Sequence, residues 1–272
     1  MEAIALIGID LGKRTYHVHA QDRVGRMVMR KAFTRSQLLT YLVRLPACRV
    51  VMEACAGAHW FARKLLAMGH EPKLIAPQYV RPFVKTNKHD FADAEAICEA
   101  SSRPAMRYVA TKSVDQQCLS VLHRLRESWV SERTAMMNQA HGFLLEFGVS
   151  AVPSKALLLK LPELIDRPEL ELPETLKALL VRLSERYRDL QDQIDALDRE
   201  ISNRLKQDEA AQRLLEIPGI GPVTASLIAA EAGAGACPRF CVNGHEAGDC
   251  LAPRSSDDRK EEECGCAVCV AG

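Results

Sequence analysis

Four acidic residues in the first third of the chain could gather into one site. Asp10 follows the apolar run "AIALIGI", and Glu53 ends the run "CRVVME" in the same manner. Asp90 and Asp93 are three residues apart at the expected start of a helix, so both face the same side of it. The ends of two neighbouring strands and one helix face can bring these four carboxylates into one pocket.

A cluster of carboxylates repels itself unless a cation is bound. Oxygen ligands of this kind suit hard cations, Mg²⁺ or Mn²⁺. Two such ions about 3.5–4 Å apart can activate a water or hydroxyl and stabilise the leaving oxygen of a phosphodiester. Basic side chains nearby would then hold a nucleic-acid backbone. They are Lys13, Arg14, Lys85, Lys88 and His89. Singly, each acid also has an ordinary structural explanation as a turn, strand-end, N-cap or first-turn residue.

The elements that must position these residues alternate between strand and helix. Apolar patterning predicts strands at residues 3–9, 48–55 and 71–77, a hairpin at 16–33 turning near Val24 and Gly25, and helices at 35–45, 57–70 and from about 90 to 103. This alternation indicates an α/β layer domain over residues 1–110.

The second half of the chain has a helical pattern. Residues 113–147 are continuously compatible with a helix, and a stretch punctuated by prolines follows from Pro153 to Pro173. A seam with steps of 4-3-4-3-4-4 then runs through Leu183, Tyr187, Leu190, Ile194, Leu197, Ile201 and Leu205. Such steps are typical of a coiled coil or a long helical hairpin. The seam therefore predicts either a two-helix spacer or a dimerisation surface.

The segment "LLEIPGIGPVTASLIAAE" predicts a helix, a tight turn and a second helix. Gly219 and Gly221 allow positive φ, and the backbone N–H groups at the start of the second helix favour an anion. This is the pattern of a helix-hairpin-helix motif, which grips a DNA phosphate without reading bases. The structural alternative is an ordinary αα-hairpin.

Four segments together resemble the successive signatures of IS110/IS1111-type transposases. They are "IGIDLGKRTYHV", "VVMEACAGAHWFARKL", "VKTNKHDFADAEAICEA" and "LLEIPGIGPVTASLIAAE". The resemblance implies a RuvC-like (ribonuclease H-type) domain at residues 1–110, with a metal site at Asp10, Glu53, Asp90 and Asp93. It also implies a helical, coiled-coil segment at 111–210 and the start of a C-terminal transposase domain, helix-hairpin-helix-like, at 211–232.

The same resemblance implies an activity and its partners. Members of the family are recombinases that insert and excise their own element, guided by an RNA that pairs with donor and target DNA. We therefore expect DNA (element ends and target), a guide RNA and a second copy of the chain, bound through the coiled coil, as partners. The rivals are a Holliday-junction-resolvase-like nuclease and a non-catalytic nucleic-acid-binding remnant. A sugar-kinase-like relative, suggested by "GIDLG" alone, is disfavoured because no Gly-rich phosphate loops follow.

The last forty residues depart from the family pattern. A serine in a "Ser-Ser-Gly-Gly-Lys"-like stretch is the family's expected nucleophile, and here "LAPRSSDDRK" holds Ser255 and Ser256. Two aspartates replace the glycines and would repel a phosphate. Residues 233–272 also hold six cysteines, for which we weigh a zinc site, an unstructured tail and a frameshifted or truncated gene copy. The zinc ligands would be Cys237, Cys241, His245 and Cys250, or Cys264, Cys266 and Cys269. We expect the frameshift, and hence a truncated C-terminal domain; an active and an inactive copy both stay open.

Charge and hydropathy set broader bounds. The chain of 272 residues carries 36 Lys+Arg against 35 Asp+Glu, so only local patches can indicate a nucleic-acid partner. It shows neither a secretory leader nor an apolar run of the roughly 18 residues that a membrane span requires. We therefore expect a cytoplasmic protein, associated with the bacterial nucleoid.

Overall fold

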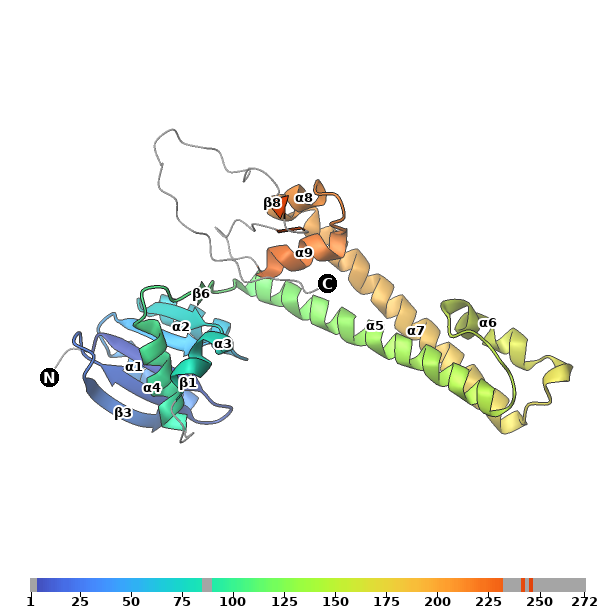
Figure 1. Ribbon diagram of the computed structural model, residues 1–272, viewed down its shortest axis with the longest axis horizontal. Coiled ribbons are helices and arrows are strands. Elements are labelled where there is room, and N and C mark those ends of the chain that lie inside the picture. Colours follow the sequence, from blue (N-terminus) through green and yellow to red (C-terminus); the bar gives the residue numbers. More distant parts are fainter. Residues whose placement is uncertain (1–3, 85–89, 232–240, 243–244, 247–272) are drawn as a thin grey trace. The chain divides into compact units, whose positions relative to one another are not determined.

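The computed structural model describes residues 4–84, 90–231, 241–242 and 245–246. The chain divides into two compact units, which we treat separately (Figure 1). The sheet unit contains the described residues up to 113, and the helical unit comprises residues 114–231.

A six-stranded mixed sheet forms the centre of the sheet unit. Its strands are β1 (Leu6–Leu11), β2 (Tyr16–Gln21), β3 (Met27–Phe33), β4 (Arg49–Glu53), β5 (Glu71–Ile75) and β6 (Tyr108–Val109). Their order across the sheet is β3-β2-β1-β4-β5-β6. Strands β1, β4 and β5 are parallel to one another, whereas β2, β3 and β6 pair antiparallel with their neighbours. This mixed α/β architecture is compatible with a RuvC-like domain.

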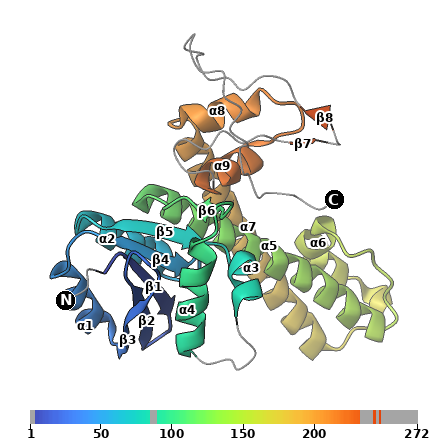
Figure 2. The same cartoon turned by 60° about the vertical axis from the view of Figure 1, so that its left-hand side comes forward.

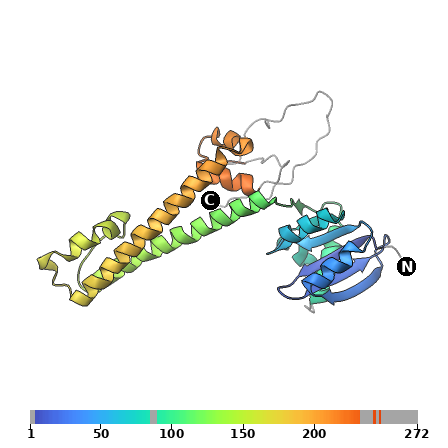
Figure 3. The same ribbon diagram turned by 180° about the vertical axis from the view of Figure 1, so that it is seen from behind.

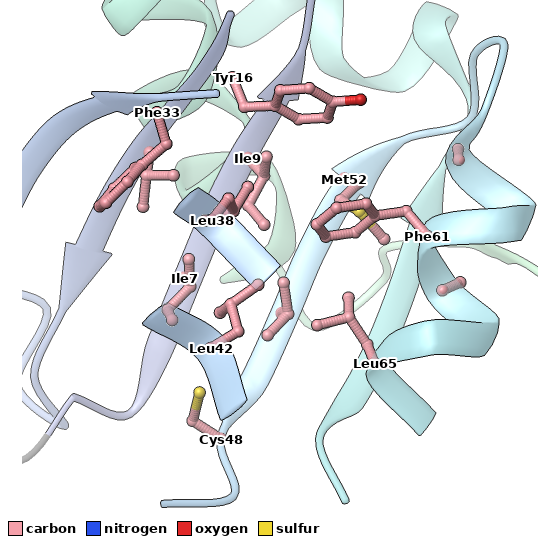
Figure 4. Close-up of a cluster of buried hydrophobic side chains, with 14 of the residues drawn as sticks. Ile7, Ile9, Tyr16, Phe33, Leu38, Leu42, Cys48, Met52, Phe61 and Leu65 are labelled. Carbon is pink, nitrogen blue, oxygen red and sulfur yellow. The ribbon is translucent and has the colours of Figure 1, made fainter. Parts of the chain in front are cut away.

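Helices cover both faces of this sheet. One face carries α1 (Arg35–Val43) and α2 (Ala58–Ala67), and the other carries α3 (Pro77–Val80), the 3-10 helix η1 (Arg81–Phe83) and α4 (Asp90–Ser101) (Figure 2). Because side chains alternate along a strand, Met52 of β4 packs in the α1–α2 core while Val51 packs against α4. The larger core, on the α1–α2 side, includes Ile7, Ile9, Leu38, Phe61 and Leu65 (Figure 4).

The turns and caps of the sheet unit follow from local chemistry. Asp22 Oδ1 accepts hydrogen bonds from the backbone N–H groups of Arg26 and Val24, and these bonds hold the pKa of Asp22 below its usual value. Gly25 adopts the positive φ that the β2–β3 turn requires, at 83°. Thr34 begins α1 with a capping box closed by Gln37. The predicted hairpin and its turn near Val24 and Gly25 are thus confirmed.

Helix α4 approaches β1 closely enough to require a glycine. A Cβ at Gly8 would lie 2.4 Å from the carbonyl oxygen of Ala94 and 2.6 Å from Sγ of Cys98. The Cys98 thiol also donates to the carbonyl oxygen of His19 at 3.5 Å, and burial raises its pKa to about 12. Gly8 therefore sets the distance between the sheet and the helix that carries Asp93.

The helical unit is built on two long antiparallel helices, α5 (Val114–Glu146) and α7 (Glu174–Leu205) (Figure 3). Between them in sequence lie α6 (Lys155–Ile165) and the 3-10 helix η2 (Pro168–Leu170), and α8 (Glu209–Leu215) and α9 (Pro222–Glu231) follow. All seam residues of α7 except Leu183, which is partly buried, are buried within this one chain. The seam therefore forms the interior of a helical hairpin, and a dimer interface would have to use other residues.

Helix α6 lies in the proline-punctuated stretch, where the sequence pattern did not predict a helix. Ser154 caps it, and Pro162 lies inside it. A proline leaves the carbonyl four residues earlier without its helical partner. Here Ser184 Oγ of α7 donates to that carbonyl, Leu158 O, at 2.8 Å. The contact between helices thus replaces the hydrogen bond that the proline removes.

Helices α8 and α9 are joined by a short turn, in the segment where a helix-hairpin-helix motif or an ordinary αα-hairpin was predicted. Asp208 caps α8, and Gly219 in the turn has φ of 90°. His123 of α5 makes a buried hydrogen bond to Ser226 of α9, with 3.0 Å between Nε2 and Oγ. This bond fixes α9, and with it the turn, to the long helices.

Only two short elements are described beyond residue 231, the antiparallel strands β7 (Cys241–Val242) and β8 (His245–Glu246). Ser255, Ser256 and the proposed zinc ligands Cys237, Cys250, Cys264, Cys266 and Cys269 lie outside the described residues, as do the side chains of Cys241 and His245. Within the described ranges, none of the helices is long and apolar enough to cross a membrane.

Candidate metal-binding carboxylate site

Asp10 and Glu53 lie side by side at one edge of the sheet. Strands β1 and β4 are parallel neighbours whose register pairs Ile9 with Met52, and each acid lies one residue beyond that pair. By alternation, Asp10 shares its face with Gly8, and Glu53 shares its face with Val51. Both of those positions contact α4. The two carboxylates are therefore at the same edge and on the same face of the sheet.

The thiol of Cys55 lies near both carboxylates. Cys55 follows β4 and is partly buried. Its pKa is raised by burial first, and then by the negative charges of Glu53 and Asp10. Both carboxylates therefore lie within electrostatic range of the same sulfur atom, which agrees with their placement on adjacent strands.

His17 connects Asp10 to the first turn of α4. It stands opposite Asp10 in the β1–β2 register, and its Nδ1 lies 3.9 Å from Asp10 Oδ2. Its ring meets the ring of Phe91 edge to face, with 4.7 Å between centroids and 75° between planes. The guanidinium of Arg30 lies 4.7 Å from the same Phe91 ring. The start of α4 is thus level with Asp10 along β1.

The two aspartates of α4 belong to this first turn and the next. Asp90 is the first residue of α4, and its side chain lies outside the described part of the structure. Asp93 is partly buried and lies one turn before Ile97, which packs against the sheet. In the described residues, no three His, Cys, Asp or Glu side chains gather closely enough to hold a metal ion. The four-carboxylate pocket accordingly stays a prediction.

The donor set nevertheless suits a hard divalent cation. Asp10 and Glu53 offer carboxylate oxygens from adjacent strands, and α4 begins beside them with two more acids. An all-oxygen set is what Mg²⁺ and Mn²⁺ prefer. Partial exposure of the Asp10 side chain, at 30%, leaves it accessible to an ion and a substrate.

The predicted nucleic-acid contacts lie at two places. Lys13 and Arg14 are exposed in the β1–β2 turn, whereas Lys85, Lys88 and His89 lie outside the described residues. Gly219 and Gly221 are in the α8–α9 turn of the helical unit, where a Cβ at either would meet nothing within 4 Å. Gly219 is therefore required for its conformation and not for lack of space.

Sequence reasoning did not single out His17 or Cys55. Only the antiparallel register of β1 and β2 places His17 opposite Asp10, and the spacing of the two residues gives no signal of it. Cys55 had a weak signal, because it lies two residues after Glu53.

Comparison with known proteins gives one consistent result. The profile of a family described as a DEDD-type, IS110 "Transposase" matches residues 7–148. The transposase for insertion sequence element IS1328 of Yersinia enterocolitica is 52% identical over 235 residues, which cover 86% of this chain and 70% of that protein. A probable family 20 transposase of Pseudomonas aeruginosa is 44% identical over 85% of this chain and 69% of its own length. The transposase for element IS1111A of Coxiella burnetii is 35% identical, over 86% and 64% respectively.

Proposed function

Because this chain belongs to the IS110-type DEDD transposase family, we propose that it cleaves and rejoins DNA strands to move an insertion element, guided by an RNA. The single observation that carries the proposal is the placement of Asp10 and Glu53 on adjacent parallel strands, facing the helix that holds Asp93. The substrates would be the ends of the element and its target DNA.

The cations of this site would be Mg²⁺ or Mn²⁺, held by Asp10, Glu53, Asp90 and Asp93. Bound there, such ions supply an activated nucleophile and charge stabilisation for phosphodiester cleavage. Within the chain, His17 would help to position the Asp10 carboxylate, since its Nδ1 lies 3.9 Å from Asp10 Oδ2 and its ring contacts Phe91 in the first turn of α4. The close approach of α4 at Gly8 would keep Asp93 near the strand ends.

Other residues would hold the nucleic acid. Lys13 and Arg14 in the β1–β2 turn would contact backbone phosphates beside the carboxylates, as would Lys85 and Lys88. The turn containing Gly219 and Gly221 would bind a further phosphate at the start of α9. In the family pattern a serine attacks the DNA, and the positions for it here are Ser255 and Ser256.

We assign the activity to three segments: a catalytic domain at 1–110, a helical spacer at 111–210 and the start of the C-terminal transposase domain at 211–232. Copies of the chain would associate through residues of the helical spacer other than the α7 seam, which is buried within one chain. A protein that acts on chromosomal DNA is expected at the bacterial nucleoid.

The test is divalent-dependent cleavage of a branched DNA carrying the end of the element, with its RNA present. Asp10→Asn should abolish cleavage, since it removes one carboxylate charge from the site. Glu99→Gln is the matched control, because Glu99 lies on α4 but is exposed and paired with Arg103. Equal loss in both variants would contradict the assignment of the site.

The same reactions separate the rival functions. A covalent protein–DNA adduct on a denaturing gel would identify a serine in the tail as the nucleophile. Cleavage without an adduct would favour a resolvase-like nuclease. DNA binding without any cleavage in either Mg²⁺ or Mn²⁺ would favour a non-catalytic remnant.

A further inference from the structure

Five aromatic residues lie in or beside the core on the sheet face opposite the carboxylates. Tyr41 stacks on Phe33, with 5.3 Å between centroids, and Phe33 stands opposite Tyr16 in the β2–β3 register. Tyr16 stacks on Phe61 at 5.7 Å, and Phe61 meets Trp60 at 6.2 Å. We call these five residues the aromatic row; Figure 4 shows three of them, Phe33, Tyr16 and Phe61, among the buried side chains of the core.

Three exposed cations lie over two rings of this aromatic row, Phe33 and Trp60. Lys31 Nζ lies 5.2 Å from the centre of the Phe33 ring. The guanidinium of Arg35 and Lys64 Nζ lie 5.5 and 5.8 Å from the centre of the Trp60 ring. Arg35 Nε also donates to the hydroxyl of Tyr16 at 2.9 Å. Among the described residues, none of the three cations lies within ion-pair distance of a carboxylate.

The described carboxylates do not neutralise the three charges on this face. Since Arg35 and Lys64 share one ring, their charged groups are at most about 11 Å apart. Ring quadrupoles attract cations, yet they cancel no charge. An anionic ligand would therefore be stabilised over this row. Because the Trp60 ring already faces two cations, the surface offers charge to a phosphate backbone and little ring area for stacking a base.

The aromatic row lies at the same sheet edge as the carboxylates. Tyr16 stands opposite Leu11, the residue after Asp10. Trp60 is in the first turn of α2, the helix that follows Glu53 and β4. The three cations are thus on the α1–α2 face of the sheet. The carboxylates lie at the same edge of the sheet but on its other face, which α4 covers.

We propose that Lys31, Arg35 and Lys64 bind the backbone of duplex DNA on the arm that flanks the bond cleaved at the carboxylates. The proposal rests on the function proposed above, because it takes the carboxylate site as the place of cleavage. Double-stranded DNA fits the surface best, since it turns its bases inward and presents about one phosphate per 1.7 Å of helix axis. The contact would position DNA without reading its sequence.

The chain contains a probe for this contact. It has two tryptophans, Trp60 and Trp129, and Trp129 lies in α5 of the helical unit. In a Trp129→Phe background, Trp60 is the only indole fluorophore. A 20-base-pair duplex is titrated into this full-length protein in EDTA, at several salt concentrations, and the fluorescence of Trp60 is recorded. EDTA removes cleavage, so binding is measured independently of the metal site.

The test variant is Lys31→Gln, Arg35→Gln and Lys64→Gln together. Each lost phosphate contact makes the slope of log K against log salt less negative by about 0.9, so the triple variant should shift it by about 2.7. The matched control removes the same total charge from three exposed arginine side chains elsewhere in the sheet unit: Arg23→Gln, Arg44→Gln and Arg107→Gln. Circular dichroism establishes that each variant is folded.

The expected result is quenching of Trp60 by duplex and a reduced slope in the test variant only. An unchanged slope, or an equal change in the control variant, overturns the proposal. Tighter binding of a single strand or of an RNA of the same length than of the duplex overturns the assignment of the ligand. If the slope changes as expected while the wild-type chain cleaves nothing with Mg²⁺ or Mn²⁺, the proposed function fails and this contact stands.

Discussion

Replacing Gly8 by alanine should separate α4 from the sheet and thereby damage the carboxylate site. The added Cβ would lie 2.4 Å from the backbone carbonyl oxygen of Ala94, whereas ordinary contact begins at 3.4 Å. The helix or the strand must therefore move by about 1 Å. Because the clash involves backbone, a change of rotamer cannot relieve it.

Two opposing effects set the magnitude. Overpacking of this kind costs about 1–3 kcal/mol. Replacing glycine also lowers the entropy of the unfolded chain, which stabilises the fold by about 0.4–1 kcal/mol. The net loss in the free energy of unfolding should be about 1–2 kcal/mol. The rate of cleavage should fall by more than this loss of stability alone would cause, since a 1 Å misplacement of reacting groups can cost about 10²-fold in rate.

Urea denaturation and divalent-dependent cleavage measure these two effects separately. Cys98→Ala in the Gly8→Ala background should recover only part of the loss, because it removes the Sγ contact and leaves the Ala94 carbonyl in place. Gly142→Ala is the control: it lies in α5 with open space around its Cβ, and alanine should stabilise the helix by about 0.5–1 kcal/mol. A Gly8→Ala protein with wild-type stability and cleavage would refute the reasoning.

Three further outcomes follow from the helical unit. Ile194→Ala, at a 1%-exposed seam position, should lower the free energy of unfolding by about 2–5 kcal/mol in urea denaturation. Gly219→Ala forces alanine to φ of 90° and should cost about 1–2 kcal/mol and weaken duplex binding, whereas Gly221→Ala, without a positive φ, should change both less. Burial, and next the charge of Arg126, lower the pKa of His123, against the opposing charges of Glu231 and Asp198. The unfolded chain therefore binds the proton first: the His123 contribution is complete above about pH 6.5 and is lost as the pH falls toward the lower folded pKa. Thermal melts of His123→Gln should accordingly show a shallower loss of stability below pH 6.5 than the wild type.

The strands that carry Asp10 and Glu53 could be predicted from local patterning. Each apolar run is followed or ended by an acid, and β1 and β4 occupy the expected segments. That the two strands are parallel neighbours could not be deduced from the sequence, because strand order depends on contacts between distant segments. The position of His17 opposite Asp10 depends on the β1–β2 register in the same way.

Two features of the helical unit show why local patterns are insufficient. The seam of α7 allowed either a hairpin or a dimer, and only the packing of α5 and α6 against it decides for the hairpin. Pro162 argued against a helix at α6, yet the hydroxyl of Ser184 compensates for its missing N–H.

In the sheet unit, the sequence patterns also missed the aromatic row, since its residues come from β2, β3, α1 and α2.

The two long helices also set the length of the helical unit. Helix α7 has 32 residues, and at 1.5 Å per residue it spans about 48 Å. The α8–α9 turn is attached at one end of this span and α6 packs toward the other (Figure 3). At about 3.4 Å per base pair, the span equals some 14 base pairs of DNA. Inserting seven residues into both α5 and α7 would lengthen it by about 10 Å, or three base pairs, and would shift the phosphate contact proposed at the α8–α9 turn by that distance relative to α6.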